Sequence, residues 1–247
     1  MAKFIQGVVV GQRRWTERLL SLQIEAESIR FEAGQFTKLA LPVEGNMLAR
    51  AYSFVNAPQE RPHEFYYNIV PDGALTQRLA RLQAGEAVWV SPGAAGFLVL
   101  SEVPEARNLW LLATGTGIAP FLSILKSETA WRRYGRIVLV DAVRRAEDLA
   151  YRDCVEHLKR EQAGRFTSVV FVSRELAPGG LTGRIPQALI DGRLEAAAGV
   201  ELSAASSQVM LCGNPAMVTD AVHALAQRGM KKHRRRSPGH ITVENYW

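Results

Sequence analysis

An arginine, an aromatic ring and a hydroxyl stand within four residues, 50–53 ("RAYS"), inside a stretch that is otherwise apolar and strand-like. Alternate residues of a strand share a face, so Arg50 and Tyr52 point one way and Ser53 the other. A flat aromatic ligand that carries phosphate would use all three, through stacking on Tyr52, charge from Arg50 and a hydrogen bond with Ser53. The alternative, a chance tetrapeptide on an amphipathic strand, stays open on these residues alone.

A second candidate site follows at residues 73–76 ("GALT"), where a helix is expected to begin. The helix is predicted from three leucines at i, i+4 and i+7, which share one face: Leu75, Leu79 and Leu82. The free amides of a first helical turn attract anions, so the amides and the hydroxyl of this stretch are suited to a diphosphate.

A glycine-rich turn in "LLATGTGIAPFLSIL" (residues 111–125) joins a buried strand to a helix. Gly115 and Gly117 permit a close approach of the backbone to a ligand, and Pro120 fits the first helical turn because its missing amide would have had no partner. The turn therefore favours a pyrophosphate. The alternative is a tight strand-to-helix turn that binds nothing, since the third glycine of the usual G-x-G-x-x-G motif is absent.

Three arginines follow predicted strands of the second half: Arg144, Arg174 and Arg184. The carboxyl ends of parallel strands form one crevice, so we expect two of these side chains to converge there. Arginine binds phosphate through paired, charge-assisted hydrogen bonds, which favours NADP over NAD. Asp141 keeps NAD open, since an acid there binds ribose hydroxyls. Surface ion pairs with Glu147 or Glu175 are the structural alternative.

Two cysteines occur, Cys154 and Cys212, without the clustered spacing that holds iron-sulfur clusters or zinc. We therefore expect no metal site in this chain. Cys212 lies at a strand end in "MLCGNPAMV", where a lone cysteine is usually a small buried hydrophobe. Its place at the crevice also permits contact with a bound ring.

The elements that must position these residues differ between the two halves. Short strands separated by Gly, Pro and Asn predict a small antiparallel barrel from residues 4–10, 18–26, 34–41, 49–56, 64–71 and 86–92. Apolar runs that alternate with helical patterns predict a parallel sheet covered on both faces from residues 108–115, 136–143, 166–173 and 207–213. We place the boundary near residues 101–105.

The bulk composition fits two ordinary soluble domains. The chain has 247 residues, of which 47% are hydrophobic and 22% charged, with 30 basic and 24 acidic side chains. No apolar run is long enough to cross a bilayer, and the first residues do not form a signal peptide, so we expect a cytoplasmic protein. A monomer is a separate expectation, which these features do not decide.

The net charge of +6 comes from one stretch, "RGMKKHRRR" (residues 228–236), which holds six Lys or Arg and no acid. The other 24 basic residues balance the 24 acidic ones. Such a patch attracts nucleic acid, a membrane surface or an acidic protein. A solvated helix end is the alternative, because Lys and Arg also favour helix C-termini.

The motifs occur in a telling order: R-x-Y-S, G-x-x-T, G-T-G-I-A-P, C-G-N-P and an acid with terminal aromatics in "VENYW". In this order the chain resembles the ferredoxin-NADP reductase family, and within it the bacterial flavodoxin/ferredoxin-NADP reductases, over essentially its whole length. The resemblance implies an FAD-binding antiparallel barrel in residues 1–101 and an α/β parallel-sheet NADP-binding domain in residues 106–247, whose C-terminal tail returns to the flavin.

The resemblance also implies roles for individual residues. It places along the flavin Arg50, Ala51, Tyr52, Ser53, Tyr66, Tyr67, Asn68, Ile69, Ala74, Leu75 and Thr76. It places around NADP(H) Thr116, Gly117, Arg144, Ser173, Arg174, Arg184 and Asn214. The catalytic positions it implies are Ser53, Cys212 and Glu244. Tyr246 and Trp247 would close over the flavin, with Trp247 on its adenine; an anchor for the tail is the alternative.

The activity implied is hydride transfer from NADPH to FAD, followed by electron transfer to ferredoxin or flavodoxin. An acidic carrier would dock on a basic surface that includes Lys231, Lys232, Arg234, Arg235 and Arg236. The alternatives are an NAD(P)H-flavin reductase, a reductase that supplies an oxygenase and, from another class, a basic nucleic-acid-binding protein. The branch often has a small or uncharged residue where Asp141 stands, which leaves the nucleotide preference less defined than the fold.

Overall fold

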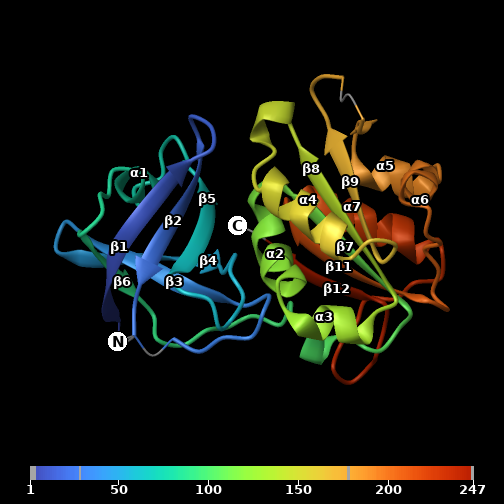
Figure 1. Ribbon diagram of the computed structural model, residues 1–247, viewed down its shortest axis with the longest axis horizontal. Coiled ribbons are helices and arrows are strands. Elements are labelled where there is room, and N and C mark those ends of the chain that lie inside the picture. The colour runs from blue at the N-terminus through green and yellow to red at the C-terminus, as the bar shows by residue number, and fades with distance from the viewer. Residues whose placement is uncertain (1–3, 28, 177–178, 246–247) are drawn as a thin grey trace.

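Two six-stranded sheets lie side by side in the computed structural model, which describes residues 4–27, 29–176 and 179–245 (Figure 1). The first sheet is antiparallel and the second parallel. The predicted fold class, an antiparallel barrel followed by an α/β parallel sheet, is therefore confirmed.

The first sheet has the strand order β4-β3-β6-β1-β2-β5. Its strands are β1 (Ile5–Arg14), β2 (Leu19–Glu25), β3 (Phe36–Val43), β4 (Asn46–Ser53), β5 (His63–Asn68) and β6 (Ala87–Val90). An isolated bridge between Phe54 and Phe65 joins its two edges, which closes the sheet into a barrel. Alternate side chains of β2 fill the interior, where Leu20, Leu22 and Ile24 are fully buried.

One short helix, α1 (Thr76–Leu79), covers an end of this barrel. Leu75 and Leu79 are buried in the barrel core and Leu82 packs against it, so the predicted apolar face is confirmed. The helix ends earlier than the leucine spacing predicts, because the amide of Leu82 donates to the carbonyl of Leu79, three residues back, and the chain continues in tight turns.

The second sheet has the order β10-β9-β8-β7-β11-β12. Its strands are β7 (Asn108–Thr114), β8 (Arg136–Val143), β9 (Phe166–Val172), β10 (Leu181–Thr182), β11 (Ser207–Gly213) and β12 (Ile241–Asn245). The central strands are apolar on both faces, as β7 shows, where six of seven residues are buried. Such strands need helices on both sides.

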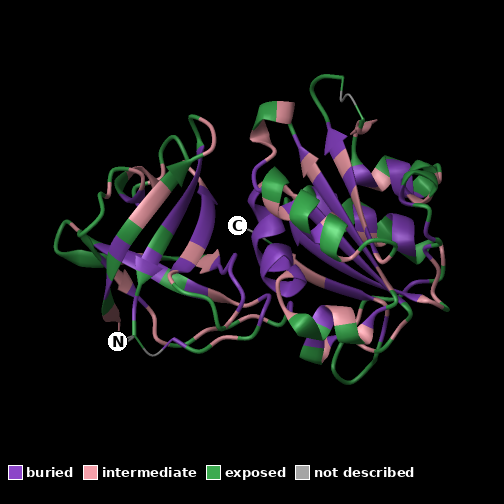
Figure 2. Cartoon of the chain, viewed as in Figure 1, coloured by how far each residue is buried: buried purple, intermediate pink, exposed green. Residues whose placement is uncertain are grey.

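Helices cover both faces of this sheet, so that the strands form a buried layer (Figure 2). One face carries α2 (Ala119–Leu125), α3 (Glu128–Arg133) and α4 (Arg152–Glu161), and the other carries α5 (Ile185–Ile190), α6 (Arg193–Ala198) and α7 (Pro215–Ala226). Short 3₁₀ turns complete the chain at η1 (Leu100–Glu102), η2 (Gly115–Ile118) and η3 (Ala146–Asp148). None of the helices described is long and apolar enough to cross a membrane.

The two sheets share a buried seam. Val55 and Tyr66 of the first half belong to the same apolar cluster as Leu111 and Phe121 of the second. Within this seam the hydroxyl of Ser123 on α2 donates to the carbonyl of Asn56, at 2.8 Å and fully buried. Burial of apolar surface and of a satisfied polar pair therefore fixes one sheet against the other.

A glycine in the loop between β2 and β3 permits one close approach within this arrangement. Gly34 has φ +103°, and a Cβ there would lie 2.0 Å from the carbonyl oxygen of Leu98, in the segment that leads to the second sheet. Gly45 has a similar φ of +79° with nothing within 4 Å of its Cβ position. Both positions therefore need a positive φ, but only Gly34 also lies in close contact with another segment.

We predict that Gly34→Ala lowers the free energy of unfolding by about 3 kcal/mol or more, since backbone strain and a steric clash add. Gly45→Ala is the matched control and should cost about 1 kcal/mol, the strain alone. Urea unfolding of both variants measures the difference. Equal losses would show that the contact with Leu98 has no energetic weight.

Candidate active site between the two sheets

Ser53 ends strand β4 with its side chain buried, two residues before Val55 of the seam cluster. It is 2% exposed, and its Oγ has no hydrogen-bond partner among the described residues. An unpartnered buried hydroxyl costs about 1–3 kcal/mol, so such groups commonly mark a position where a ligand supplies the partner.

Glu244 on β12 is the second polar group at the seam without a partner. Its Oε1 is buried and makes no hydrogen bond within the described chain, and β12 pairs with β11 so that Glu244 lies opposite Cys212. Burial raises the pKa of Glu244 from its ordinary value of 4.5 to about 7. This carboxyl can therefore hold a proton near neutral pH.

Phe36 and Gly96 connect these two groups. Phe36 pairs with Ser53 across the β3–β4 ladder. A Cβ on Gly96 would lie 2.9 Å from Oε2 of Glu244 and 3.1 Å from the ring of Phe36. Phe36 thus lies beside Ser53 in the strand ladder and, at Gly96, close to Glu244. The sequence interpretation missed Gly96, for which the only signal was a glycine with an aromatic neighbour between the two halves.

Tight packing joins the ends of β7 and β11 beside this site. A Cβ on Gly117 would lie 2.5 Å from the carbonyl oxygen of Cys212, and one on Gly213 would lie 2.1 Å from Oγ1 of Thr114. Thr116, which directly precedes Gly117 in η2, is 5% exposed. The glycines are therefore required for the contact between two strand ends, a role that the predicted phosphate contact does not explain.

Cys212 is fully buried in the seam cluster, as expected of a small hydrophobe. Asn214 begins α7, and its Oδ1 accepts hydrogen bonds from the amides of Ala216 at 2.9 Å and Met217 at 3.3 Å. Its backbone amide donates to Oγ1 of Thr114 at 2.8 Å and its carbonyl accepts from the amide of Val218, so its side-chain nitrogen is the group left for the predicted cofactor contact.

Tyr52 and Arg50 present a ring and a charge on β4. Tyr52 is half-buried, with its ring 6.0 Å from the ring of Tyr67 in an edge contact. Burial raises the pKa of Tyr52, and the charge of nearby Arg50 lowers it by less, so the phenol stays neutral. Arg50 and Ala51 are exposed. This arrangement suits stacking and anion binding, and the assignment of the flavin to it stays a prediction.

The two adjacent tyrosines of β5 face opposite ways. Tyr66 packs in the seam cluster, whereas Tyr67 lies in the barrel core, where its hydroxyl accepts a hydrogen bond from Gln12 Nε2 at 3.3 Å. The side chain of Tyr67 therefore packs inside the barrel, because strand alternation places only one of the pair toward the second sheet, and the cofactor contact of this segment stays a prediction. Asn68 and Ile69, which follow, are half-buried.

The side chains of the loop before α1 are largely engaged in contacts within the barrel and the loop itself. The side chain of Leu75 is 3% exposed in the barrel core, so the predicted cofactor contact of this residue would be made by its backbone. The hydroxyl of Thr76 accepts a hydrogen bond from the amide of Val70 at 3.0 Å. Ala74 is exposed. Only the backbone of this loop remains available for the predicted diphosphate.

The crevice arginines are solvent-exposed, and two of them lie side by side. The amide of Arg174 donates to the carbonyl of Arg144 at 3.0 Å, beyond the ends of β8 and β9. Arg184, also exposed, precedes α5, and Ser173 lies beside Arg174 with its hydroxyl donating to the carbonyl of Val143 at 3.3 Å.

The structural alternative for these arginines, surface ion pairs, is wrong for the part of the chain that is described. No ion pair there includes Arg144, Arg174 or Arg184. Glu175 instead accepts a hydrogen bond from the amide of Ala146 at 2.7 Å. Their guanidinium groups are thus available to an anionic ligand, and the 2'-phosphate assignment stays a prediction.

Asp141 lies inside the sheet rather than at the crevice edge. It is 6% exposed, on the face of β8 that Ile137 and Leu139 share, and its Oδ1 has no partner in the described chain. Burial raises its pKa from the ordinary 3.8 to about 7, against a smaller opposing effect of Arg152. A buried carboxyl does not fit the contact with ribose hydroxyls that kept NAD open.

The basic run lies in the loop between α7 and β12, so the alternative of a helix end is wrong. The five basic side chains of the predicted surface are exposed: Lys231, Lys232, Arg234, Arg235 and Arg236. Arg235 donates to both carboxylate oxygens of Glu102, at 2.8 and 2.5 Å, and its guanidinium carbon lies 4.5 Å from the centroid of the Phe97 ring. Phe97 is 64% exposed.

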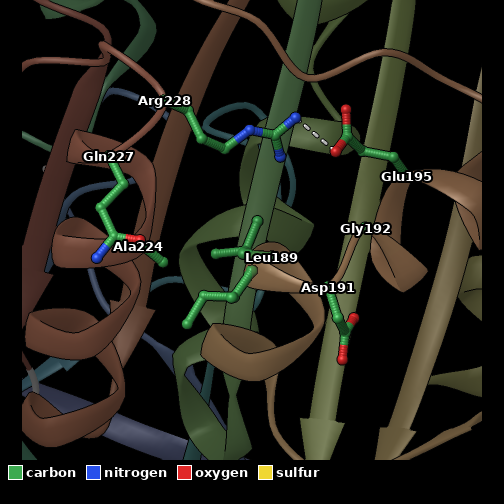
Figure 3. A pocket seen from close by; sticks show the side chains of 8 residues that line it. Leu189, Asp191, Gly192, Glu195, Ala224, Gln227 and Arg228 are labelled. Carbon is green, nitrogen blue, oxygen red and sulfur yellow. Dashed lines mark ion pairs between the residues drawn. The ribbon is translucent and has the colours of Figure 1, made fainter.

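A pocket of about 310 Å³ lies away from these residues, between α5, α6 and the end of α7 (Figure 3). Arg228 and Glu195 form an ion pair of 2.6 Å at its wall. No predicted site residue lines it. Among the described residues there is also no cluster of His, Cys, Asp and Glu able to hold a metal. The predicted roles of Tyr246 and Trp247 fall outside the described residues.

Comparisons with known proteins match both halves. Residues 15–97 match the family model of the oxidoreductase FAD-binding domain, and residues 111–223 match that of the oxidoreductase NAD-binding domain. The chain is 48% identical to a flavodoxin/ferredoxin-NADP reductase of Shigella flexneri and 47% identical to one of Escherichia coli (strain K12), each over 248 residues and all of both chains. The structure of a ferredoxin NADP⁺ reductase from Neisseria gonorrhoeae with bound FAD and NADP has a TM-score of 0.95, with 34% identity and complete coverage of both chains.

We predict that Asp141→Asn changes the pH dependence of stability. A raised pKa means that the wild-type carboxyl is protonated in the folded state but ionised in the unfolded state between about pH 4 and pH 7, so stability falls as pH rises through this window. Relative to wild type, the variant should gain roughly 2–4 kcal/mol between pH 5 and pH 8. Urea unfolding at both pH values measures this gain. Parallel pH profiles would contradict it.

Proposed function

Since the chain belongs to the flavodoxin/ferredoxin-NADP reductase family, we propose that it holds FAD at the seam, accepts hydride from NADPH and reduces ferredoxin or flavodoxin. The observation that carries the proposal is a pair of buried polar atoms without partners among the described residues, Ser53 Oγ on the first sheet and Glu244 Oε1 on the second, which Phe36 and Gly96 connect. Bound FAD would supply the conversion between two-electron and one-electron transfer.

The chain's own residues bind, orient and hold protons. Ser53 would hydrogen-bond the reactive edge of the flavin, which gives its buried hydroxyl the missing partner. Tyr52 would stack on the ring, and exposed Arg50 would neutralise the diphosphate. Glu244 would face the nicotinamide as a carboxyl that can be protonated near pH 7, since burial raises its pKa to about that value.

The arginines at the crevice edge select the nucleotide in this proposal. Arg144 and Arg174 are adjacent, exposed and outside any ion pair in the described chain, so their guanidinium groups can close on a phosphate. Arg184 would complete a basic site for the 2'-phosphate. NADPH is then preferred over NADH.

The proposal extends to the organisation of the chain. We assign residues 1–101 to the flavin and residues 106–247 to the nucleotide, and we assign Tyr246 and Trp247 to the cover of the flavin. The protein would act as a monomer in the cytoplasm. Antiparallel strands end at Val90 and parallel strands begin at Asn108, which supports this division.

A docking surface for the carrier is proposed around Phe97 and the basic loop of residues 231–236. Phe97 is the one aromatic side chain among the exposed large hydrophobic residues of the described chain. Arg235 lies over its ring, and the preceding residue, Gly96, lies against Glu244. Aromatic and arginine side chains dominate binding energy at interfaces, and the surrounding charge favours an acidic partner close to the flavin.

We predict that Arg174→Ala raises the KM for NADPH by about 10-fold or more and leaves that for NADH within about twofold, because one charge-assisted phosphate contact is lost. Initial rates with ferricyanide as acceptor, measured on the FAD-loaded enzyme, give both constants. Arg160→Ala, at an exposed arginine of α4, is the control. A wild type that uses both nucleotides equally would overturn the phosphate assignment.

We predict that Phe97→Ala and Arg234→Ala each raise the KM for a ferredoxin or flavodoxin by about 5- to 30-fold, the loss of one interface contact. Ferricyanide reduction by NADPH should stay within about twofold of wild type. Raised ionic strength should slow carrier reduction in wild type and less so in Arg234→Ala.

Ile190→Ala is the matched apolar control, because Ile190 is 59% exposed and lies at the pocket of Figure 3. It should leave the carrier KM unchanged. Carrier reduction that neither responds to salt nor changes in Phe97→Ala would reject this docking surface while the NADPH reaction stands.

A further inference from the structure

Tyr151 has a backbone conformation that tyrosine rarely adopts. It lies just before α4 with φ +56° and ψ +22°, the left-handed region, and it is 7% exposed. A bulky residue in this region is strained by about 1–3 kcal/mol and persists only where its surroundings fix it. The contacts of its side chain supply that fixation.

The ring and hydroxyl of Tyr151 insert into a socket on the first sheet. Its ring lies 4.5 Å from that of Trp15 and 5.3 Å from that of Tyr66, the latter at 88°. Its hydroxyl donates to Oε1 of Glu64 on β5 at 2.7 Å. Burial and the carboxylate of Glu64 hold the pKa of Tyr151 well above its ordinary value, so the phenol stays a donor.

The socket is itself held in place. Nε1 of Trp15 donates to Oγ of Ser21 at 3.2 Å, and the guanidinium carbon of Arg13 lies 3.7 Å from the centroid of a Trp15 ring. An open pocket of about 420 Å³ borders the same residues, with Trp15, Glu64 and Tyr151 among its walls. Tyr151 thus fills one side of an open space, so a smaller residue there would enlarge it.

Tyr151 is also fixed to the crevice edge on its own side. The short segment upstream contains Arg144, whose carbonyl accepts the amide of Arg174 at 3.0 Å. The amide of Ala146 in the same segment donates to Glu175 at 2.7 Å. The ends of β8 and β9 therefore form one unit that leads into Tyr151, and this unit carries the two arginines assigned to the nucleotide.

We propose that Tyr151 is a positioning residue for hydride transfer, which sets the crevice edge against the flavin seat through its socket of Trp15, Glu64 and Tyr66. Tyr66 belongs to the segment assigned to the flavin, so the contact runs from one cofactor site to the other. Hydride transfer needs reacting atoms about 3–3.5 Å apart, and a misplacement of about 1 Å reduces the rate by about 100-fold. The inference rests on the proposed function.

The test uses the FAD-loaded enzyme and three variants, Tyr151→Ala, Tyr151→Phe and Glu64→Gln. Stopped-flow absorbance at saturating NADPH measures the rate of flavin reduction, and long-wavelength absorbance reports stacking of the nicotinamide on the flavin. We expect Tyr151→Ala to slow reduction by about 10- to 100-fold and to lose the stacking band. Tyr151→Phe and Glu64→Gln should each slow it by about 3- to 10-fold, with the KM for NADPH and the flavin content within about twofold of wild type.

Tyr134→Phe is the matched control, because Tyr134 is buried and its hydroxyl has no partner in the described chain. It should leave both readouts unchanged. If Tyr151→Ala fails to retain flavin, Tyr151→Phe and Glu64→Gln decide the matter, since both keep the ring in place. Wild-type rates and stacking bands in those two variants would overturn the inference, whereas a wild type that NADPH does not reduce would overturn the proposed function instead.

Discussion

The seam between the two sheets governs what this molecule can do, because neither sheet holds a complete site. Ser53 ends a strand of the barrel and Glu244 lies on the edge strand of the parallel sheet, and each has a buried polar atom without a partner among the described residues. Their relation depends on the apolar cluster that contains Val55 and Tyr66 together with Leu111. A shift of one sheet against the other would separate the groups before either sheet lost its own core.

Stability at such a seam is given up in favour of binding. Unpartnered buried groups and carboxyls whose pKa is raised to about 7, as in Asp141 and Glu244, disfavour the folded chain. A cofactor that satisfies Ser53 and Glu244 recovers part of that free energy, because a ligand that binds only the folded state stabilises it. Cofactor binding and folding are thus linked at the same atoms.

Patterns of local periodicity predicted the fold well. The positions of individual side chains were predicted less well. Alternating strands and apolar runs predicted both sheets, and motif order predicted the family, because these signals come from near neighbours. Tyr67 and Leu75 were assigned to the cofactor, but their side chains lie in the barrel core. The partners of Gly96 and Tyr151 could not be read from their sequence neighbours, since these contacts depend on how two sheets pack, which pairs residues far apart along the chain.

Two polar contacts made by the second half of the chain differ in their surroundings. Tyr151 meets Glu64 in a largely buried contact, whereas Arg235 meets Glu102 with the arginine side chain 63% exposed. Dissolved salt screens the exposed pair and hardly affects the buried one. Ionic strength therefore acts inside the molecule as well as between molecules: high salt weakens the contact of Arg235 with Glu102 beside Phe97 and leaves the socket of Tyr151 intact.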